Sequence, residues 1–81
     1  MNRDEIRSIV GEIAAEIFEM DRGDISDDAD FHNDLGGDSL QRLELIVALE
    51  KRFNIHYIRG DEAQMNSIND VVDITEKYAT Q

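Results

Sequence analysis

The residue around which chemistry could be organised is Ser39, in the run "DLGGDSL" from Asp34 to Leu40. A serine in this setting could do one of two things. It could attack a substrate as an activated nucleophile, or it could be modified by a separate enzyme and then carry the added group. The residues around it have to distinguish between these two interpretations.

The nucleophile interpretation requires partners that this chain does not supply. The letters "GDSL" also open the nucleophile block of a large hydrolase family, whose serine needs a histidine base, an orienting acid and oxyanion donors. In that family the motif follows a strand of a much larger α/β domain, and an Asp-x-x-His pair lies near the C-terminus. Neither His32 nor His56 follows an Asp at this spacing, and nothing before Gly37 has the pattern of a strand. We therefore expect no catalytic residue, and we interpret both histidines as loop, exposed or packing residues.

The attachment interpretation requires an exposed serine, room for a second enzyme and tolerance of negative charge. Gly36 and Gly37 remove side-chain bulk just before the serine. A helix that starts at Ser39 would supply free N–H groups and the positive end of its dipole, which suits a phosphodiester. The modifying enzyme would bring its own base. Taken alone, the motif could also be an ordinary loop followed by a capped helix.

The acidic residues before the serine raise the possibility of a calcium loop, because acids alternate from Asp28 to Asp34. An EF-hand loop that starts at Asp28 needs glycine at its sixth position and a bidentate glutamate at its twelfth. The sequence has Asn33 and Ser39 at these positions. We therefore expect no dedicated metal site.

The chain as a whole is short and strongly acidic. Its 81 residues suffice for one domain, residues 1–81, whose single core buries about 60–65% of the unfolded surface. Nineteen acidic against eight basic residues give a net charge of −11, which opposes binding to nucleic acid and anionic membranes and favours basic patches on partner proteins. Without cysteines, a membrane-length apolar run or a signal-peptide core, the chain is expected to be cytoplasmic. The high net charge on so small a domain favours a monomer.

Helical periodicity recurs along the chain, and no segment alternates with a period of two over a convincing length. Three segments start with a pair of residues that predicts a capping box. The sequence therefore predicts an all-α fold, an antiparallel bundle of three long helices plus one short helix. A long ordered loop is expected between the first and second helices. The predicted helices cover residues 3–19, 39–53, 61–65 and 67–78, and the capping pairs are Asn2–Glu5, Asp38–Gln41 and Ser67–Asp70.

The second predicted helix is unusually apolar, and only a narrow polar face remains on it. Such a helix is expected to pack on more than one side, which would make it central to the fold. Its apolar arc consists of Leu40, Leu43, Leu45, Ile46, Val47, Leu49 and Phe53.

The segment "DLGGDSLQRLELIVALEKRFNI" resembles the acyl carrier proteins, whose signature Asp-Leu-Gly-x-Asp-Ser-Leu runs into a helix with Glu-Leu and Ala-Leu-Glu. The likeness extends over essentially all 81 residues and includes Phe31 and the "SINDVVD" start of the last helix. The resemblance implies that Ser39 carries 4′-phosphopantetheine, transferred from coenzyme A by a separate phosphopantetheinyl transferase. Gly37, Asp38 and Leu40 would frame this attachment site. The protein would then be a carrier and not a catalyst.

The same resemblance implies how the cargo is held. Acyl groups would ride on the thiol of the arm, and the flexible arm would present them to each enzyme at high effective concentration. Apolar residues beneath the arm could enclose an acyl chain, and each of them could equally be ordinary core. By matching positions these candidates are Phe31, Ile46, Leu49, Tyr57 and Met65.

Departures from the family pattern concern the second helix and the segment after it. Carriers of fatty acid synthesis usually present a strongly acidic second helix to basic patches on their enzymes. Here Arg42, Lys51 and Arg52 stand where acidic or neutral residues are common, "HYIRG" replaces an aliphatic-Pro-acidic run, and Gly37 stands where alanine is frequent. These differences favour a specialised pathway, such as that of a secondary metabolite or a modified lipid. The candidate partner-binding residues are Gln41, Glu44, Glu50 and Lys51.

Two kinds of cargo remain open. In the favoured hypothesis, a discrete carrier delivers acyl thioesters to acyl-transferring, condensing or acyl-activating enzymes of fatty acid, polyketide or specialised lipid biosynthesis. The near alternative is an aminoacyl or peptidyl carrier of a nonribosomal-peptide pathway, which uses the same arm. A small acidic interaction module that is never modified is the distant alternative.

Overall fold

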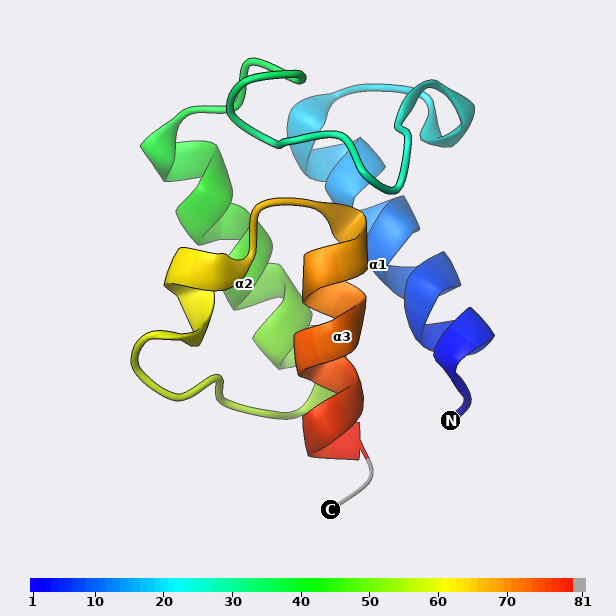
Figure 1. Cartoon of the computed structure of the whole chain (residues 1–81), viewed down its shortest axis with the longest axis vertical. Coiled ribbons are helices and arrows are strands. Elements are labelled where there is room, and N and C mark those ends of the chain that lie inside the picture. The colour runs from blue at the N-terminus through cyan, green and yellow to red at the C-terminus, as the bar shows by residue number, and fades with distance from the viewer. Residues whose placement is uncertain (80–81) are drawn as a thin grey trace.

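The computed structural model describes residues 1–79, which form helices joined by loops (Figure 1). The prediction of an all-α fold with three long helices is confirmed, and the short fourth helix is a 3-10 turn, η2. A second 3-10 turn, η1, lies in the acidic loop and was not predicted. None of the helices in this part of the chain combines the length and the apolar character needed to cross a membrane. In chain order the elements are α1 (Arg3–Phe18), η1 (Arg22–Asp24), α2 (Ser39–Phe53), η2 (Asp61–Gln64) and α3 (Ile68–Ala79).

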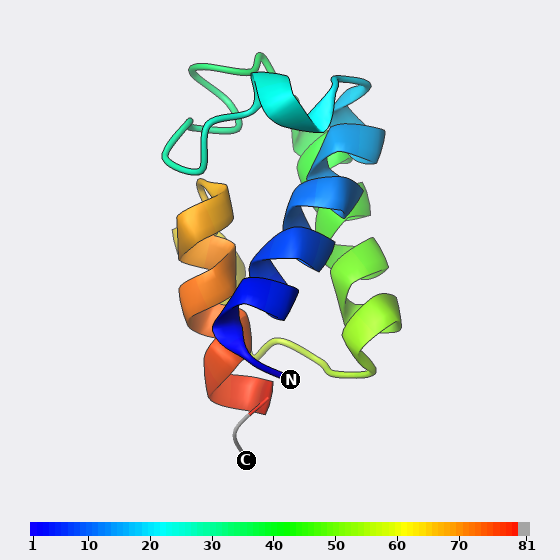
Figure 2. The ribbon, with the colours of Figure 1, turned by 90° about the vertical axis from the view of Figure 1, so that its right-hand side faces the viewer.

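Helix α1 runs opposite to both α2 and α3, as Figure 1 shows. After α2 the chain climbs back through residues 54–67, so α3 descends in the same direction as α2. In Figure 2, α1 stands in front, with α3 on one side and α2 on the other, and it packs against both. The helix at the centre of this arrangement is therefore α1.

The capping boxes predicted for α1 and α2 are both present. Asn2 Oδ1 accepts a hydrogen bond from Glu5 N at 2.8 Å, and Glu5 Oε1 accepts one from Asn2 N at 3.3 Å. In α2, Asp38 Oδ1 accepts from Gln41 N at 2.8 Å, and Gln41 Oε1 accepts from Asp38 N at 3.1 Å. Each box satisfies backbone N–H groups that the first turn of a helix leaves without partners.

At the start of α3, only half of the predicted box forms. Ser67 Oγ accepts from Asp70 N at 3.2 Å, as a capping serine should. The Asp70 carboxylate, however, accepts from Asn66 N at 3.2 Å, one residue before the cap. The prediction of a reciprocal Ser67–Asp70 pair was wrong in this second half, because the carboxylate satisfies the preceding loop.

The core is contributed by all three helices and by both long connections. The acidic loop is packed through its apolar residues, as predicted: Ile25 and Phe31 are buried, and Ala29 and Leu35 are half-buried. The buried apolar residues are Ile6, Val10, Ala14, Phe18, Ile25, Phe31, Leu45, Leu49, Met65, Ile68, Val71, Val72 and Ile74.

The apolar arc of α2 is not packed on more than one side. Leu45 and Leu49 are buried, whereas Leu40, Leu43 and Val47 are 64%, 57% and 54% exposed. The prediction that α2 would be the central helix was wrong. Helix α1 occupies the middle, so the opposite side of α2 faces solvent.

The acidic loop is ordered by carboxylates that cap backbone N–H groups. Asp30 Oδ1 accepts from Asn33 N at 2.8 Å and from His32 N at 2.9 Å, and Asp34 Oδ2 accepts from Asp30 N at 2.7 Å. The bond from Asn33, together with that from His32, lowers the pKa of the Asp30 carboxyl. Within residues 1–79 no three His, Asp or Glu side chains are grouped as ligands for a metal ion.

Gly11 lies in the middle of α1 because the side chain of Arg22 crosses the helix at that point. A Cβ atom at Gly11 would fall 1.9 Å from Arg22 Nε. From this position Arg22 donates to Ile25 O and to the Asp27 carboxylate, both at 2.9 Å. Glycine lowers the intrinsic stability of the helix. Its missing side chain leaves room for the Arg22 contacts that hold η1 against α1.

Candidate functional site

Ser39 is the first residue of α2 and its side chain is exposed. The Asp38 carboxylate before it is folded back onto Gln41 N. The Ser39 hydroxyl itself makes no hydrogen bond within the part of the chain that the structure describes. Ser39 therefore presents an unengaged hydroxyl at the N-terminus of a 15-residue helix, where backbone N–H groups and the helix dipole favour a bound anionic group.

The two glycines before Ser39 have different roles. Gly36 has φ +70°, in the left-handed region that glycine adopts without strain, and nothing lies within 4 Å of the place its Cβ would take. Gly37 is buried, and a Cβ there would lie 2.5 Å from Phe18 Cε1 and 2.8 Å from Phe31 O. Gly36 thus leaves the surface open, as expected, whereas the space freed at Gly37 is filled from inside by Phe18.

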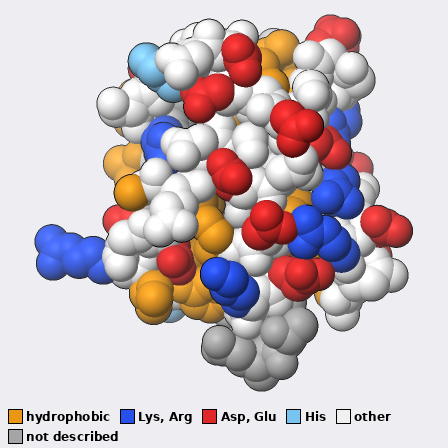
Figure 3. Space-filling model, viewed as in Figure 1, with side chains coloured by type: hydrophobic (Ala, Val, Ile, Leu, Met, Phe, Trp, Pro, Cys, Tyr) orange, Lys and Arg blue, Asp and Glu red, His pale blue; other side chains and the backbone are white. Residues whose placement is uncertain are grey.

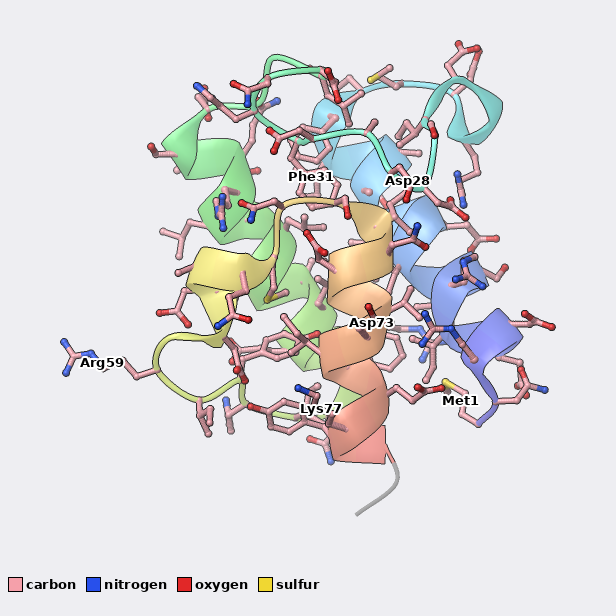
Figure 4. The ribbon with its side chains drawn as sticks, viewed as in Figure 1. Met1, Asp28, Phe31, Arg59, Asp73 and Lys77 are labelled. Carbon is pink, nitrogen blue, oxygen red and sulfur yellow. The ribbon has the colours of Figure 1, made fainter. Side chains whose placement is uncertain are left out.

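A cavity of about 270 Å³ opens beside Ser39. Two stacked aromatic rings form its wall: the centroids of Phe18 and Phe31 are 5.2 Å apart. Figure 4 shows Phe31 beneath the acidic loop, near the upper ends of the helices. The cavity is lined by Phe18, Phe31, His32, Gly37, Asp38, Ser39 and Arg42.

His32 lies at this cavity as an exposed loop residue, in line with the sequence interpretation. Its Nδ1 is 2.9 Å from Gly37 O. Because a carbonyl oxygen only accepts, Nδ1 carries the proton and donates to it. No hydrogen bond joins His32 to Ser39 within residues 1–79. The imidazole therefore supports the turn before α2 and is not arranged as a base for the serine.

Arg42 is the site residue whose role the sequence did not indicate. It was singled out only as a charge that departs from the family pattern, yet it is half-buried and turned inward. Its Nη1 donates to Asn66 Oδ1 at 3.1 Å, and its Nη2 donates to the backbone carbonyl of Glu62. Asn66 O in turn accepts from Phe31 N at 2.8 Å. These contacts join α2, η2 and the acidic loop. The sequence did not indicate them because the contacting residues are far apart along the chain.

Two of the four candidate partner-binding residues are used for contacts within the chain. Gln41 completes the α2 cap and donates to Ile17 O at 3.4 Å. The carboxylate of Glu50 accepts from Tyr57 N at 2.8 Å. Glu44 and Lys51 are exposed. The structure thus leaves Glu44 and Lys51 on the surface and uses Gln41 and Glu50 within the chain.

The five acyl-pocket candidates separate in a similar way. Phe31, Leu49 and Met65 are buried, and Ile46 and Tyr57 are half-buried. Phe31 is the one of the five that lines the cavity beside Ser39. Tyr57 forms a hydrogen bond of 2.7 Å with Thr75 Oγ1, and burial raises its pKa to about 12.

All three arginines of α1 and η1 form ion pairs within the chain. Arg3 contacts the carboxylates of Asp73 at 2.5 Å and Glu76 at 3.1 Å, and Arg22 contacts Asp27. On the face of the molecule that Figure 3 shows, basic side chains lie among acidic ones on the side where α1 lies. Arg59, by contrast, extends away from the body of the molecule (Figure 4). Positive charge is therefore available to partners mainly after the middle of α2.

Lys51 also borders a second hollow, about 460 Å³ in volume, between α1 and α2. Its floor is apolar, and charged side chains stand on both of its walls. It is lined by Ile13, Glu16 and Ile17 from α1 and by Ala48, Lys51 and Arg52 from α2.

Comparison with known proteins assigns the family. The model of the family described as "Phosphopantetheine attachment site" matches residues 8–74. An acyl carrier protein from Guillardia theta is 39% identical over 80 residues, covering 98% of this chain and 99% of the relative. The chain belongs to the acyl carrier protein family, whose members are normally carriers and not catalysts, and its prosthetic group is phosphopantetheine.

Solved structures agree with this assignment. A suggested acyl carrier protein from Mycobacterium tuberculosis superimposes with a TM-score of 0.82 at 27% identity, covering 90% of this chain and 97% of the other. An acyl carrier protein from Enterococcus faecalis gives a TM-score of 0.74 at 25% identity, covering 90% and 92%.

The residues around Ser39 fit a phosphopantetheine arm. The arm consists of a phosphodiester followed by an apolar and amide-bearing chain. The start of α2 can accept the phosphodiester, because its first N–H groups and dipole favour negative charge. The aromatic wall formed by Phe18 and Phe31 can contact the apolar part that follows.

Proposed function

We propose that the whole chain acts as one carrier domain that holds acyl intermediates as thioesters on a 4′-phosphopantetheine arm attached to Ser39. The observation that carries this proposal is the exposed hydroxyl of Ser39, without a hydrogen bond within residues 1–79, at the start of α2 and inside the segment that the family model matches. A phosphopantetheinyl transferase would supply the base and bind coenzyme A, which donates the group, so the chain needs no catalytic residue of its own.

The other serines suit attachment less well. Ser67 is buried, and its hydroxyl caps α3. Ser26 Oγ lies in the acidic loop and accepts from Asp28 N at 3.4 Å. Ser8 is exposed, but it lies within α1, where the backbone N–H groups are already bonded along the helix. Ser39 alone combines exposure with a helix N-terminus, which is where a phosphodiester is stabilised.

The loaded arm would visit acyl-transferring, condensing or acyl-activating enzymes of fatty acid, polyketide or specialised lipid biosynthesis. The outward side of α2 next to Ser39 offers a docking surface of exposed apolar residues, Leu40, Leu43 and Val47, beside Glu44 and Lys51. Apolar anchors surrounded by charged side chains are typical of specific protein interfaces. The proposal includes a monomeric carrier that works in the cytoplasm.

Loading with coenzyme A tests the attachment directly. The protein is incubated with coenzyme A and a broad-specificity phosphopantetheinyl transferase, and its intact mass is measured. We expect a gain of one phosphopantetheine group, which Ser39→Ala abolishes and which the matched variants Ser8→Ala and Ser26→Ala retain. A mass that stays at the unmodified value, while a known carrier in the same tube is converted, would refute the proposal.

The class of cargo is tested on the loaded protein. Fatty acyl-activating enzymes and amino-acid-adenylating enzymes are offered in parallel, and acylation of the thiol is again read by intact mass. The proposal predicts acyl loading. Aminoacyl loading alone would replace the acyl carrier by its aminoacyl or peptidyl counterpart.

A further inference from the structure

Arg42 occupies the position on α2 that separates Ser39 from the core. Residues three or four places apart lie on the same side of a helix. Arg42 follows Ser39 by three places and precedes the partly buried Ile46 by four, and Leu49 follows Ile46 by three. A group tethered to Ser39 and directed along this side of α2 would meet Arg42 before it reached Leu49, which is fully buried.

The Arg42 side chain crosses from α2 to the segment between η2 and α3. It donates to the Asn66 side chain at 3.1 Å and to the Glu62 carbonyl. Glu62 and Asn66 stand on either side of Met65, which is 1% exposed. The planar guanidinium can hold both acceptors at once, which a lysine ammonium would not do with the same geometry.

The acceptors on the far side of this crossing are themselves held in place. Asn66 O accepts from Phe31 N at 2.8 Å, and Asn66 N donates to Asp70 at 3.2 Å. Met65 N donates to Glu62 O at 3.3 Å. Displacing Arg42 would therefore remove the partner of Asn66 Oδ1 and leave Glu62 O with the Met65 N–H alone, which disfavours spontaneous opening.

We propose that Arg42, with Asn66 and Glu62, forms a clasp that closes the path from Ser39 into the core. The tethered group then rests in the outer cavity against Phe18 and Phe31 and does not enter between Leu49 and Met65. This inference rests on the proposed attachment at Ser39. At about 270 Å³, the outer cavity lies just below the range of about 300–1,000 Å³ that holds drug-sized ligands. It therefore has room for the near part of the arm against the aromatic wall, and an alkyl chain on the thiol would extend into solvent.

The test uses the holo protein acylated with butanoyl or octanoyl groups through amide-linked pantetheine analogues. Methyl signals of Met65 and Leu49 are followed by NMR. In the wild-type protein we expect these signals to be the same for both chain lengths. In Arg42→Ala, the octanoyl group should shift them. Arg52→Ala is the matched control, because Arg52 is an exposed arginine of the same helix that makes no hydrogen bond or ion pair within residues 1–79.

A second readout is the hydrolysis of true thioesters. Octanoyl and butanoyl thioesters should hydrolyse at similar rates on the wild-type protein and on Arg52→Ala. On Arg42→Ala the octanoyl thioester should last about fivefold longer, since entry into the core excludes water. If Arg42→Ala loses helical circular dichroism, Arg42→Met replaces it, because methionine keeps an unbranched apolar stem like that of arginine and has no donors.

The outcomes separate this inference from the proposed function. Octanoyl-dependent shifts of Met65 in the wild-type protein would overturn the clasp, and so would an Arg42 variant that behaves like Arg52→Ala. Failure of loading at Ser39 is seen by intact mass beforehand and refutes the proposed function instead. In the unmodified protein, hydrogen exchange at the Met65 amide should be faster in Arg42→Ala than in Arg52→Ala, which tests the clasp without any arm. Equal exchange rates would overturn it.

Discussion

The two sides of α2 contain the same kinds of residue in opposite environments. Leu45 and Leu49 are buried on one side, while Leu43 and Val47 are more than half exposed on the other. The hydrophobic effect would favour burial of Leu43 and Val47 as well, and neighbouring exposed apolar residues are typical of interaction surfaces. The exposed residues lie next to Ser39, where partner enzymes would have to approach. The inward side of α2 therefore stabilises the fold, and under the proposed function its outward side serves contacts with partner enzymes.

The largest expected effect is a difference in stability between alanine variants of two leucines, one from each side of α2. Leu49→Ala should lower the free energy of unfolding by about 2–5 kcal/mol, because it leaves a cavity in the core. Leu43→Ala should change it by no more than about 0.5 kcal/mol, because that side chain is already in water. Urea unfolding followed by circular dichroism measures both.

A domain of this size has a total stability of only about 5 kcal/mol, so a partly unfolded Leu49→Ala in buffer would agree with the prediction. Equal losses for Leu49→Ala and Leu43→Ala would show that the outward side of α2 is also packed, and the comparison would fail. Leu43→Ala should also slow transfer from the loaded arm to a partner enzyme without changing loading at Ser39.

A smaller effect is expected just before α2, where buried Gly37 and exposed Ser39 lie two residues apart. Gly37→Ala should cost about 1–3 kcal/mol of unfolding free energy, because its Cβ overlaps the Phe18 ring. Gly23→Ala is the matched control: nothing lies within 4 Å of its added Cβ, and little change is expected.

Thermal or urea unfolding of the two glycine variants provides the comparison. Adding Phe18→Leu to Gly37→Ala should cost less than the sum of the two single changes, since the smaller side chain relieves the overlap. Strictly additive losses would mean that Phe18 is not what keeps position 37 free of a side chain.

The smallest effect is a pH dependence from Tyr57, whose hydroxyl forms a hydrogen bond with the buried Thr75. Burial raises the pKa of Tyr57 to about 12 in the folded state, against about 10 in an unfolded chain. The stability this group contributes is thus complete below about pH 10 and is lost as the pH rises through about 12.

Urea unfolding at about pH 9 and about pH 11 should show a loss of stability that is smaller in Tyr57→Phe than in the wild-type protein. Tyr78, whose pKa is raised by its hydrogen bond to Asp61 and by burial, remains in both proteins, so the difference isolates Tyr57. An identical loss in both would exclude Tyr57 as a source of the alkaline instability.

Local features of this protein were predictable from its sequence alone. The helix starts at Asn2 and Asp38 depend on side chains that bond to backbone groups three residues away. The apolar spacing of the helices is equally local. Ser39 was identified in the same way, because its setting consists of the adjacent glycines, the cap and the helix start.

Only the tertiary structure decided which side of each element is buried and which is exposed. Nothing near α2 in the sequence indicates that α1 takes the central position and leaves Leu40 and Leu43 exposed. Arg42 bonds with residues 20 and 24 positions away, and Gly37 is constrained by Phe18 of another helix. Local hydrogen bonds and periodicity are determined by residues that are close in the sequence. Burial and long-range contacts depend on how the helices pack against one another. For this reason the proposed attachment site at Ser39 could be predicted from the sequence, and the contacts of Arg42 beneath it could not.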